Sequence, residues 1–569
     1  MKILTLILFV SIVELSGQIV APGILQQFNK NKEVNVIIEL KSKADLSTIN
    51  PEMTKLEKAT LAYQKLHNTA IQSQYKLIQK LKSISVEYHS FFIINAIAAK
   101  ITKDQLDLIV GIEDIKYIHL DESISLERQN DAIVQNLKAR GPMITWGIER
   151  IEANKVWNLG YEGQGVVVAG EDTGYKWDLE GIKEKYRGYS LDSIEHNYNW
   201  HDAIHNVSPL SGDSLNPCGF NLKAPCDDDN HGSHTMGTMV GSTATDAYGI
   251  SPKAKWIGCR NMERGNGALS TYIECFEFFL APTDLDGLNP KPELSPSVVN
   301  NSWYCSRSEG CDTNNFSIMD EAVSNLRNSG VVVVVSAGND GQACGRIAAP
   351  AGIYKSSFVV GAFAEDDQIS YFSSSGPVYN YKDTIIKPDV VAPGSAVISR
   401  IRSGDLVSWD GTSMAGPHVA GLVALIISAN PALNGNVNKI EKIIKESARR
   451  AETSLDCPPF KGTDYPNYVY GYGKIMAFEA IKLALITKSE ESEKSKSNFY
   501  IIPNPVADQF RIIFNQENLN YQFVIVNSLG QISMKINNST SEINTNNLVS
   551  GTYLLLDQIS NKSIRFIKL

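Results

Sequence analysis

Cysteine is missing from large parts of this 569-residue chain, because all eight cysteines lie between residues 218 and 457. No two of them form a Cys-x-x-Cys pair, which argues against a structural zinc site. An even, clustered set of cysteines in a chain with an export signal predicts disulfide bonds instead. The sequence does not fix their connectivity; the favoured pairs are the close ones, Cys218 with Cys226 and Cys305 with Cys311.

Long hydrophobic runs are also scarce. Met1 and Lys2 precede an apolar run over residues 3–13 that is too short to cross a bilayer, and the small residues Ser16 and Gly17 follow. This arrangement predicts a secretory signal peptide that is cut near Gly17. We expect no membrane-spanning helix further along the chain, and therefore a soluble protein after export.

An excess of positive charge is the third feature that the sequence lacks. The formal net charge is −9, and no basic cluster of the kind that binds DNA is present, so a nucleic-acid partner is not expected. The apolar fraction of 43% and the charged fraction of 20% are those of an ordinary globular protein. The length predicts roughly two to four domains.

Three stretches carry the residue types of a catalytic triad. Residues 166–174 form an apolar run that ends in Asp172 and a turn glycine, residues 231–238 begin with His231, and residues 411–418 contain Ser413. A serine hydroxyl is a weak nucleophile, so it needs a base and a group that holds this base in the right tautomer. The segment after Ser413 is apolar nearly all round, which predicts a buried helix whose N-terminal N–H groups face the serine.

In this order, the three stretches resemble the active-site signatures of the subtilases. The resemblance runs from about Trp146 to about Ala484. Three further segments are similar to the branch of the family around bacillopeptidase F, namely Ile257–Met262, Tyr272–Phe279 and Val299–Trp303. The resemblance implies an α/β fold with a mostly parallel sheet and helices on both faces.

The resemblance also implies a role for each candidate site residue. Ser413 would be the nucleophile and His231 its base. Asp172 would orient the imidazole, and Asn339 would donate a hydrogen bond to the oxyanion. The substrate cleft would be lined by Ser302, Trp303, Tyr304, Ser336, Ala337 and Gly338.

Some neighbouring residues need separate interpretation. His234 follows His231 by one helical turn, but the family motif gives the catalytic role to the first histidine, so His234 and His418 are expected to be structural. A glycine is usual in the family where Tyr304 stands. Because this departure lies beside the substrate backbone, no preferred substrate side chain is predicted.

The acidic run Asp227–Asp229 just before His231 raises the question of a metal. Acidic loops are usually solvated, and a calcium site needs ligands from several segments. Many subtilases bind structural calcium, so the resemblance leaves a structural calcium ion open, with no ligands named. No organic cofactor is expected.

The segment before residue 126 has the pattern of a small α+β module. Strands are expected over 34–40, 91–101 and 115–120, a helix over 56–81, and a second helix after the capping box at 102–105. The part from Phe91 to Asp121 resembles the inhibitor propeptide of subtilases. That resemblance implies a folding template and intramolecular inhibitor, which is cut off between about Ser125 and Arg140.

Short valine-rich runs without polar alternation predict strands of a buried parallel sheet. These runs are Val166–Ala169, Trp256–Cys259, Val298–Asn301, Val331–Val335 and Phe358–Gly361. In open α/β sheets, functional groups gather beyond the carboxyl ends of the strands. Asp172 and Asn339 each follow such a run, which is an independent reason to place them together.

The sequence changes character again near its end. Residues 487–497 have almost no apolar content and predict a solvated linker. Strands expected over 510–514, 521–526, 532–536 and 553–556 predict a small β-sandwich. The segments Pro503–Pro505, Asn527–Gln531, Gly551–Leu555 and Ile567–Leu569 resemble the C-terminal sorting domain of the type IX secretion system. A carbohydrate-binding or adhesive sandwich is the alternative.

The predicted domains are a signal peptide (1–17), an inhibitor-like propeptide (18–125), a processed connecting segment (126–145), a subtilisin-like catalytic domain (146–486), a linker (487–498) and a sorting domain (499–569). The expected function is a serine endopeptidase, exported through the periplasm to the extracellular space or cell surface, which hydrolyses protein or peptide substrates through a Ser413 acyl-enzyme. It would act as a monomer, with its own propeptide and the type IX machinery as partners. The alternatives are a surface protein that only binds, and a peptide ligase.

Overall fold

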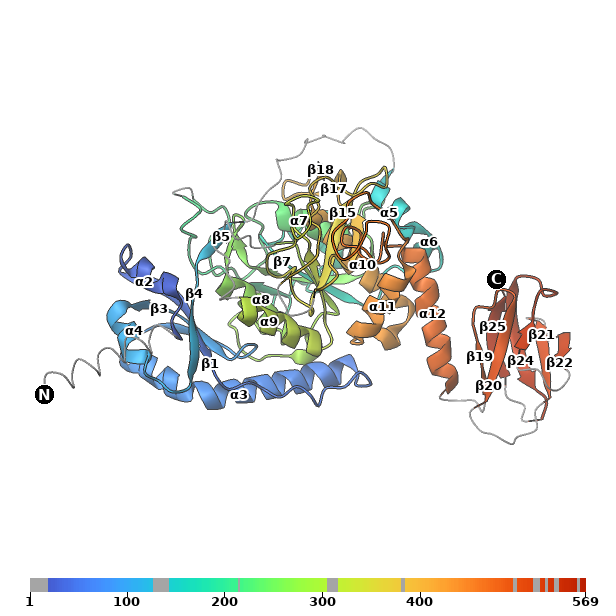
Figure 1. Ribbon diagram of the computed structural model, residues 1–569, viewed down its shortest axis with the longest axis horizontal. Coiled ribbons are helices and arrows are strands. Elements are labelled where there is room, and N and C mark those ends of the chain that lie inside the picture. The colour runs from blue at the N-terminus through green and yellow to red at the C-terminus, as the bar shows by residue number, and fades with distance from the viewer. Residues whose placement is uncertain are drawn as a thin grey trace, which may run out of the picture. The chain divides into compact units, whose positions relative to one another are not determined.

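Figure 1 shows the computed structural model of the chain. The structure describes residues 19–125, 143–212, 215–303, 316–379, 384–494, 499–514, 522–527, 531–536, 542–559 and 563–568. The predicted signal peptide, Tyr304 and the predicted pair Cys305 with Cys311 lie outside these residues, as does most of the connecting segment. Internal contacts divide the chain into two units, Met1–Phe478 and Glu479–Leu569.

The N-terminal module is a four-stranded antiparallel sheet with the order β2-β3-β1-β4. Its elements are α2 (Pro22–Phe28), β1 (Glu33–Leu40), α3 (Lys55–Ser83), β2 (Tyr88–Phe91), β3 (Ala96–Thr102), α4 (Lys103–Ile109), β4 (Ile115–Leu120) and β5 (Ser123–Ser125). Leu77 and Leu81 of α3 pack with Val36 and Ile38 of β1 in a separate apolar core. The predicted capping box is confirmed, since Thr102 and Gln105 exchange both hydrogen bonds at the start of α4.

The strand expected over residues 91–101 is wrong as a single element. The structure has two strands, β2 and β3, separated by a turn over residues 92–95. Asn95 closes this turn in the left-handed region, with φ of 48°. Asparagine tolerates that region better than most residues, so the apolar run Phe91–Ile94 could bend without a glycine.

The catalytic unit is built on a seven-stranded sheet with the order β16-β15-β14-β13-β7-β10-β8, in which every neighbouring pair is parallel. Its strands are β7 (Val167–Asp172), β8 (Trp200–Asp202), β10 (Lys255–Arg260), β13 (Val298–Asn301), β14 (Val332–Ser336), β15 (Phe358–Phe363) and β16 (Val390–Pro393). All five predicted strands are present. The edge strands β8 and β16 were not predicted, since each is too short to give a pattern.

Helices cover both faces of this sheet, and side-chain alternation shows which face each layer takes. Ala169, Ile257, Val299 and Val333 point to one face and belong to a single cluster with α8 (Leu269–Leu280) and α9 (Phe316–Asn328). Asp172 points to the other face, where α7 (His231–Val240) and α10 (Thr412–Ala429) pack against each other and against the sheet. The predicted fold class is therefore confirmed.

The remaining elements of this unit are short. They are β6 (Met143–Ile144), α5 (Trp146–Arg150), α6 (Ala153–Asn158), η1 (Lys183–Lys185), β9 (Asp246–Ala247), β11 (Met262–Glu263), β12 (Asn266–Ala268), η2 (Pro292–Leu294), β17 (Val397–Arg400), β18 (Leu406–Trp409), η4 (Pro431–Leu433) and α11 (Val437–Ser447). Strand β6 pairs with β9, so the last residues of the predicted connecting segment belong to the catalytic unit.

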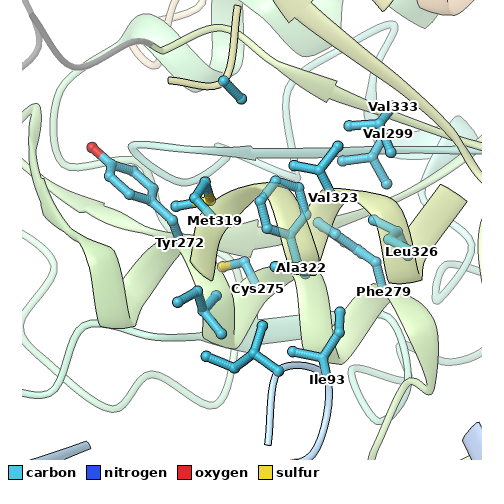
Figure 2. Packing of buried hydrophobic residues seen from close by; sticks show 14 of the residues in the cluster. Ile93, Tyr272, Cys275, Phe279, Val299, Met319, Ala322, Val323, Leu326 and Val333 are labelled. Atoms are coloured by element: carbon cyan, nitrogen blue, oxygen red, sulfur yellow. The ribbon is translucent and has the colours of Figure 1, made fainter. Parts of the chain in front are cut away.

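The N-terminal module packs on the layer formed by α8 and α9. Ile37, Ala62, Leu66, Phe91 and Ile93 of the module share one buried cluster with these helices. Figure 2 shows Ile93 beside Phe279 and Ala322, below the sheet residues Val299 and Val333. The contact surface is therefore apolar at its centre, as a stable interface requires.

Helix α10 has the length and apolar composition that a membrane-spanning helix would need, contrary to our expectation for the chain after its signal. However, 94% of its apolar window is buried inside the protein, so α10 is a core helix, as predicted from its apolar circumference. Among the residues that the structure describes, no other helix meets the same criteria.

Three disulfides join cysteines of the described residues. Cys218–Cys226 confirms one predicted pair. Cys259–Cys275 connects β10 to α8, and Cys344–Cys457 closes a loop of 113 residues. Neither of these two was predicted, because only the folded sheet brings residues so far apart in the sequence together.

The second unit begins within α12 (Ala477–Lys494) and continues as two small sheets. The linker prediction is wrong as far as Lys494, because the backbone there continues α12; glutamate and lysine are good helix formers even without apolar neighbours. The sheets have the orders β19-β20-β23 and β22-β21-β24-β25, and both contribute to one apolar core, which confirms the predicted β-sandwich. The strands are β19 (Phe499–Ile502), β20 (Gln509–Phe514), β21 (Phe523–Asn527), β22 (Ile532–Ile536), β23 (Glu542–Asn544), β24 (Gly551–Asp557) and β25 (Ser563–Lys568).

Candidate active site

Asp172 is the last residue of β7, and its side chain is 1% exposed. Its Oδ1 accepts a hydrogen bond of 2.7 Å from the Nδ1 of His231 and another of 2.7 Å from the backbone N–H of Thr173. Its Oδ2 accepts from the Thr235 hydroxyl at 3.2 Å. These donors fix the carboxylate, and the carboxylate fixes both the tautomer and the orientation of the His231 ring.

His231 is the first residue of α7, and Asp227 holds this end of the helix in place. Asp227 accepts from the Thr173 hydroxyl at 2.9 Å and from the Ser233 backbone N–H at 2.9 Å. The preceding Asn230 has φ of 129° and makes no side-chain cap. Asp227 therefore does the work of a helix cap while it ties α7 to the end of β7.

Ser413 is the second residue of α10, directly after Gly411 and Thr412. Gly411 has φ of 151°, a backbone conformation that favours glycine. The Ser413 hydroxyl donates to the Ser302 carbonyl oxygen at 3.1 Å, and the Ser302 hydroxyl donates to the Ser413 carbonyl oxygen at 2.8 Å. The prediction placed the Ser413 hydroxyl on His231, whereas its hydrogen bond in this structure goes to the end of β13.

Asn339 follows β14 and is fixed to the start of α10. Its Oδ1 accepts from the Thr412 backbone N–H at 3.0 Å and from the Thr412 hydroxyl at 2.9 Å. The two donors assign the amide oxygen, so the Nδ2 group is the donor that Asn339 turns away from Thr412. This Nδ2 lies close to Gly411, 3.9 Å from the position that a Cβ atom would take there.

The other two histidines of the signature segments are buried and neutral. The Nε2 of His234 lies 3.2 Å from the Val397 carbonyl oxygen, and its ring stacks on Trp409. His418 binds the Met414 carbonyl oxygen through Nδ1 at 2.8 Å. Burial lowers the pKa of His234 to about 3 and that of His418 to about 4. These contacts support the structural role expected for both.

The residues expected to line the cleft lie at the ends of β13 and β14. Of the six, five fall within the described residues and all five are buried: Ser302, Trp303, Ser336, Ala337 and Gly338. Ser302 contacts the Ser413 residue directly, and the backbone N–H of Gly338 donates to the Thr412 hydroxyl at 3.2 Å. The two strand ends therefore converge on the start of α10.

The acidic loop before His231 is committed to protein partners. Arg260, which is fully buried, binds Asp202 through Nε at 2.8 Å and Asp228 through Nη1 at 3.2 Å. Asp227 accepts from Thr173 and the helix α7 as described above. Within the described ranges, no group of three His, Cys, Asp or Glu side chains is placed to hold a metal ion. This loop does not fit calcium, and we derive no step through a metal.

Sequence reasoning missed three residues that organise the site: Thr412, which fixes Asn339; Thr235, which donates to Asp172; and Glu171, a buried acid beside Asp172. For Glu171 a signal was available, since it is the single carboxyl group inside an otherwise apolar strand pattern before Asp172. The two threonines gave no signal, because their contacts depend on residues far away in the sequence.

Comparison with known proteins agrees with this geometry. Residues 163–473 match the model of the subtilase family, and residues 500–568 match the model of the secretion system C-terminal sorting domain. Bacillopeptidase F of Bacillus subtilis (strain 168) is 31% identical over 494 residues, which cover 81% of this chain and 32% of that protein. The serine protease AprX of Bacillus subtilis (strain 168) is 29% identical over 282 residues, which cover 45% of this chain and 59% of AprX.

A solved structure shares the fold. The epidermin leader peptide processing serine protease EpiP from Staphylococcus aureus superimposes with a TM-score of 0.57 at 16% identity, over 79% of this chain and 99% of that chain. The chain spans only about a third of the length of bacillopeptidase F. Its sorting domain indicates secretion to the extracellular space or the cell surface. The long family match and the fold together establish that the chain belongs to the subtilase family of serine peptidases.

Proposed function

We propose that the protein is a secreted serine endopeptidase that uses Ser413 as nucleophile, His231 as general base and acid, and Asp172 as the orienting carboxylate. The observation that supports this most directly is the hydrogen bond of 2.7 Å between His231 Nδ1 and Asp172 Oδ1, at the end of the helix that packs against the Ser413 helix. This bond leaves Nε2 as the ring nitrogen that can accept a proton.

The reaction then follows from the positions of these groups. The Ser413 hydroxyl turns from the Ser302 carbonyl to His231, which takes its proton as the oxygen attacks the substrate carbonyl carbon. The oxyanion accepts hydrogen bonds from the Ser413 backbone N–H and the Asn339 Nδ2, and the positive end of the α10 dipole favours this charge. His231 returns the proton to the leaving amine, and water hydrolyses the acyl-enzyme by the same route in reverse.

The test of this proposal is chemical labelling of the secreted protein. A fluorophosphonate reporter should label the wild type at Ser413, as identified by mass spectrometry, and casein should be cleaved at internal bonds. A protein that only binds would neither be labelled nor release fragments. If an added amine captures the acyl group in place of water, the protein is a peptide ligase.

Asn339→Leu should lower kcat with little change in KM, because the lost donor acts on charge that develops only in the transition state. Removal of the corresponding donor in subtilisin costs about 10²- to 10³-fold in kcat, and we expect a loss of that order. Asn339→Asp is the matched variant, since it keeps the acceptor for Thr412 and removes only the donor. Steady-state kinetics on a peptide substrate measure both, and an unchanged kcat in Asn339→Asp would contradict the role.

We further propose that the N-terminal module inhibits the enzyme until it is cut off. Three contacts support this. Strand β5 pairs with β12 of the catalytic unit in antiparallel register, from Ser123 with Ala268 to Ser125 with Asn266. Asp121 accepts from the Ser270 backbone N–H at 3.0 Å, in the first turn of α8. The module also carries its own core, as a separable inhibitor needs.

Glu277→Leu should weaken this inhibition by about 10- to 100-fold, because Glu277 accepts from the backbone N–H groups of Phe92 at 2.6 Å and Ile93 at 2.9 Å, and a buried N–H without a partner is costly. Glu277→Gln keeps an acceptor oxygen and should bind the module more tightly than Glu277→Leu. The inhibition constant of the isolated 19–125 module against each processed enzyme is the measurement. Equal constants for all three enzymes would rule out this contact as a determinant of docking.

A further inference from the structure

Glu171 is a buried carboxyl group for which the proposed reaction has no use. It stands directly before Asp172 in β7 and is 0% exposed. Because successive side chains of a strand point to opposite faces, Glu171 points away from the Asp172–His231 pair and into the layer of α8 and α9. Burial raises the pKa of Glu171 well above its usual range, so the group is a neutral acid.

The partner of Glu171 is the indole of Trp303. The Nε1 of Trp303 donates to Glu171 Oε1 at 3.1 Å. The indole is 1% exposed and stacks on the Tyr272 ring, with centroids 3.8 Å apart and planes 9° apart. Since Glu171 also lies opposite Asn301 in the register of β7 and β13, this hydrogen bond ties the carboxyl end of β7 to the chain that leaves β13.

This chain segment reaches the nucleophile through the neighbour of Trp303. Ser302 accepts the hydrogen bond of the Ser413 hydroxyl with its carbonyl oxygen and donates its own hydroxyl to the Ser413 carbonyl oxygen. The stacked and hydrogen-bonded indole fixes the residue that follows Ser302. The carboxyl group of Glu171 is thus connected to Ser413 through Trp303 and Ser302, without contact with the reacting atoms.

We propose that Glu171 is a positioning residue: its carboxyl group accepts the Trp303 indole N–H and so holds the Ser302–Trp303 segment in the geometry that binds an extended peptide. The inference rests on the proposed function, in which this segment lines the substrate cleft. An apolar side chain at residue 171 would leave the indole N–H without an acceptor in the core, and the indole would move to find one. A misplaced cleft wall costs substrate binding before it costs the chemistry of Ser413.

The experiment compares the processed wild type with Glu171→Gln, Glu171→Leu, Trp303→Phe and the Glu171→Leu/Trp303→Phe double variant. Two quantities are measured: KM for an extended peptide substrate, and the rate at which a small fluorophosphonate labels Ser413. We expect Glu171→Leu to raise KM about tenfold, the effect of one buried unpaired donor. The labelling rate should change less than about threefold, because the probe does not use the cleft. Glu171→Gln keeps the acceptor and should restore KM to near the wild-type value.

The double variant separates positioning from a general loss of stability. If Glu171 acts through the indole N–H, Glu171→Leu should raise KM by less than about twofold in the Trp303→Phe background, where that N–H is absent. Full additivity, an unchanged KM in Glu171→Leu, or equal losses in KM and labelling rate would each overturn the proposal. Should Glu171→Leu fail to be secreted, Trp303→Phe with and without Glu171→Gln gives the same cycle, and additive effects would again refute it. A wild type that is not labelled at Ser413 would instead refute the proposed function.

Discussion

Ser413→Ala should lower kcat by about a million-fold, the loss that follows removal of the serine nucleophile in subtilisin. The reason is that Asp172 and His231 act only through the Ser413 oxygen, so its removal idles the whole constellation at once. A residual rate above that of water is expected from the oxyanion donors Asn339 and the Ser413 backbone N–H, which the substitution leaves in place. Hydrolysis of a peptide ester and fluorophosphonate labelling give the two measurements.

The matched control is Ser428→Ala, which changes another serine of the same helix. The Ser428 hydroxyl donates to the Leu425 carbonyl oxygen at 2.8 Å, far along α10 from the site. It should keep kcat within about twofold. N-terminal sequencing adds an independent result: if the enzyme cuts its own propeptide, the Ser413→Ala protein keeps it. Activity that survives in Ser413→Ala would remove Ser413 from the mechanism.

Asp172→Asn should lower kcat by about 10⁴-fold at neutral pH, as the same change does in another serine protease with this triad. In this structure Asp172 holds the Nδ1 proton of His231 and is itself fixed by Thr173 and Thr235. An amide has almost the same shape, so the site should stay folded, but its NH₂ group can turn to His231 and stabilise the tautomer with the proton on Nε2. That tautomer cannot accept the Ser413 proton.

The pH dependence of kcat/KM for Asp172→Asn checks this account. Since burial lowers the pKa of His234 and of His418 to about 3 and about 4, both are neutral above pH 5, and His231 is the histidine of the three whose protonation should shape the acid limb. Asp178→Asn is the control, as Asp178 is exposed and pairs with Lys176 at the surface. A loss of similar size in Asp178→Asn would show that a general change of charge, and not the tautomer, is responsible.

Local sequence patterns were enough to predict the central sheet and the candidate triad. Valine-rich runs such as Val298–Asn301 can only be buried on both faces, and they form the strands predicted. Asp172 and Asn339 were placed together because each follows such a run, and both indeed contact the segments that carry His231 and Ser413. These predictions succeeded because the information lies within a few residues of each site.

What the sequence could not predict depends on distant partners. The bend at Asn95, the disulfides Cys259–Cys275 and Cys344–Cys457, and the contact of the Ser413 hydroxyl with Ser302 all require neighbours that only the folded chain supplies. The helix that replaces the predicted linker is a different error. Its composition satisfied the criterion for a solvated segment, but solvation and helix formation are compatible.

Arg260 gives the loop before His231 a counter-charge that belongs to the polypeptide itself. A bound ion can be diluted away or taken by a competing ligand, whereas a guanidinium group stays charged at any pH that the protein meets and cannot dissociate. A protein released outside the cell gives up control over the composition of its surroundings. At this loop, the covalent cation keeps the approach to the catalytic histidine independent of the medium.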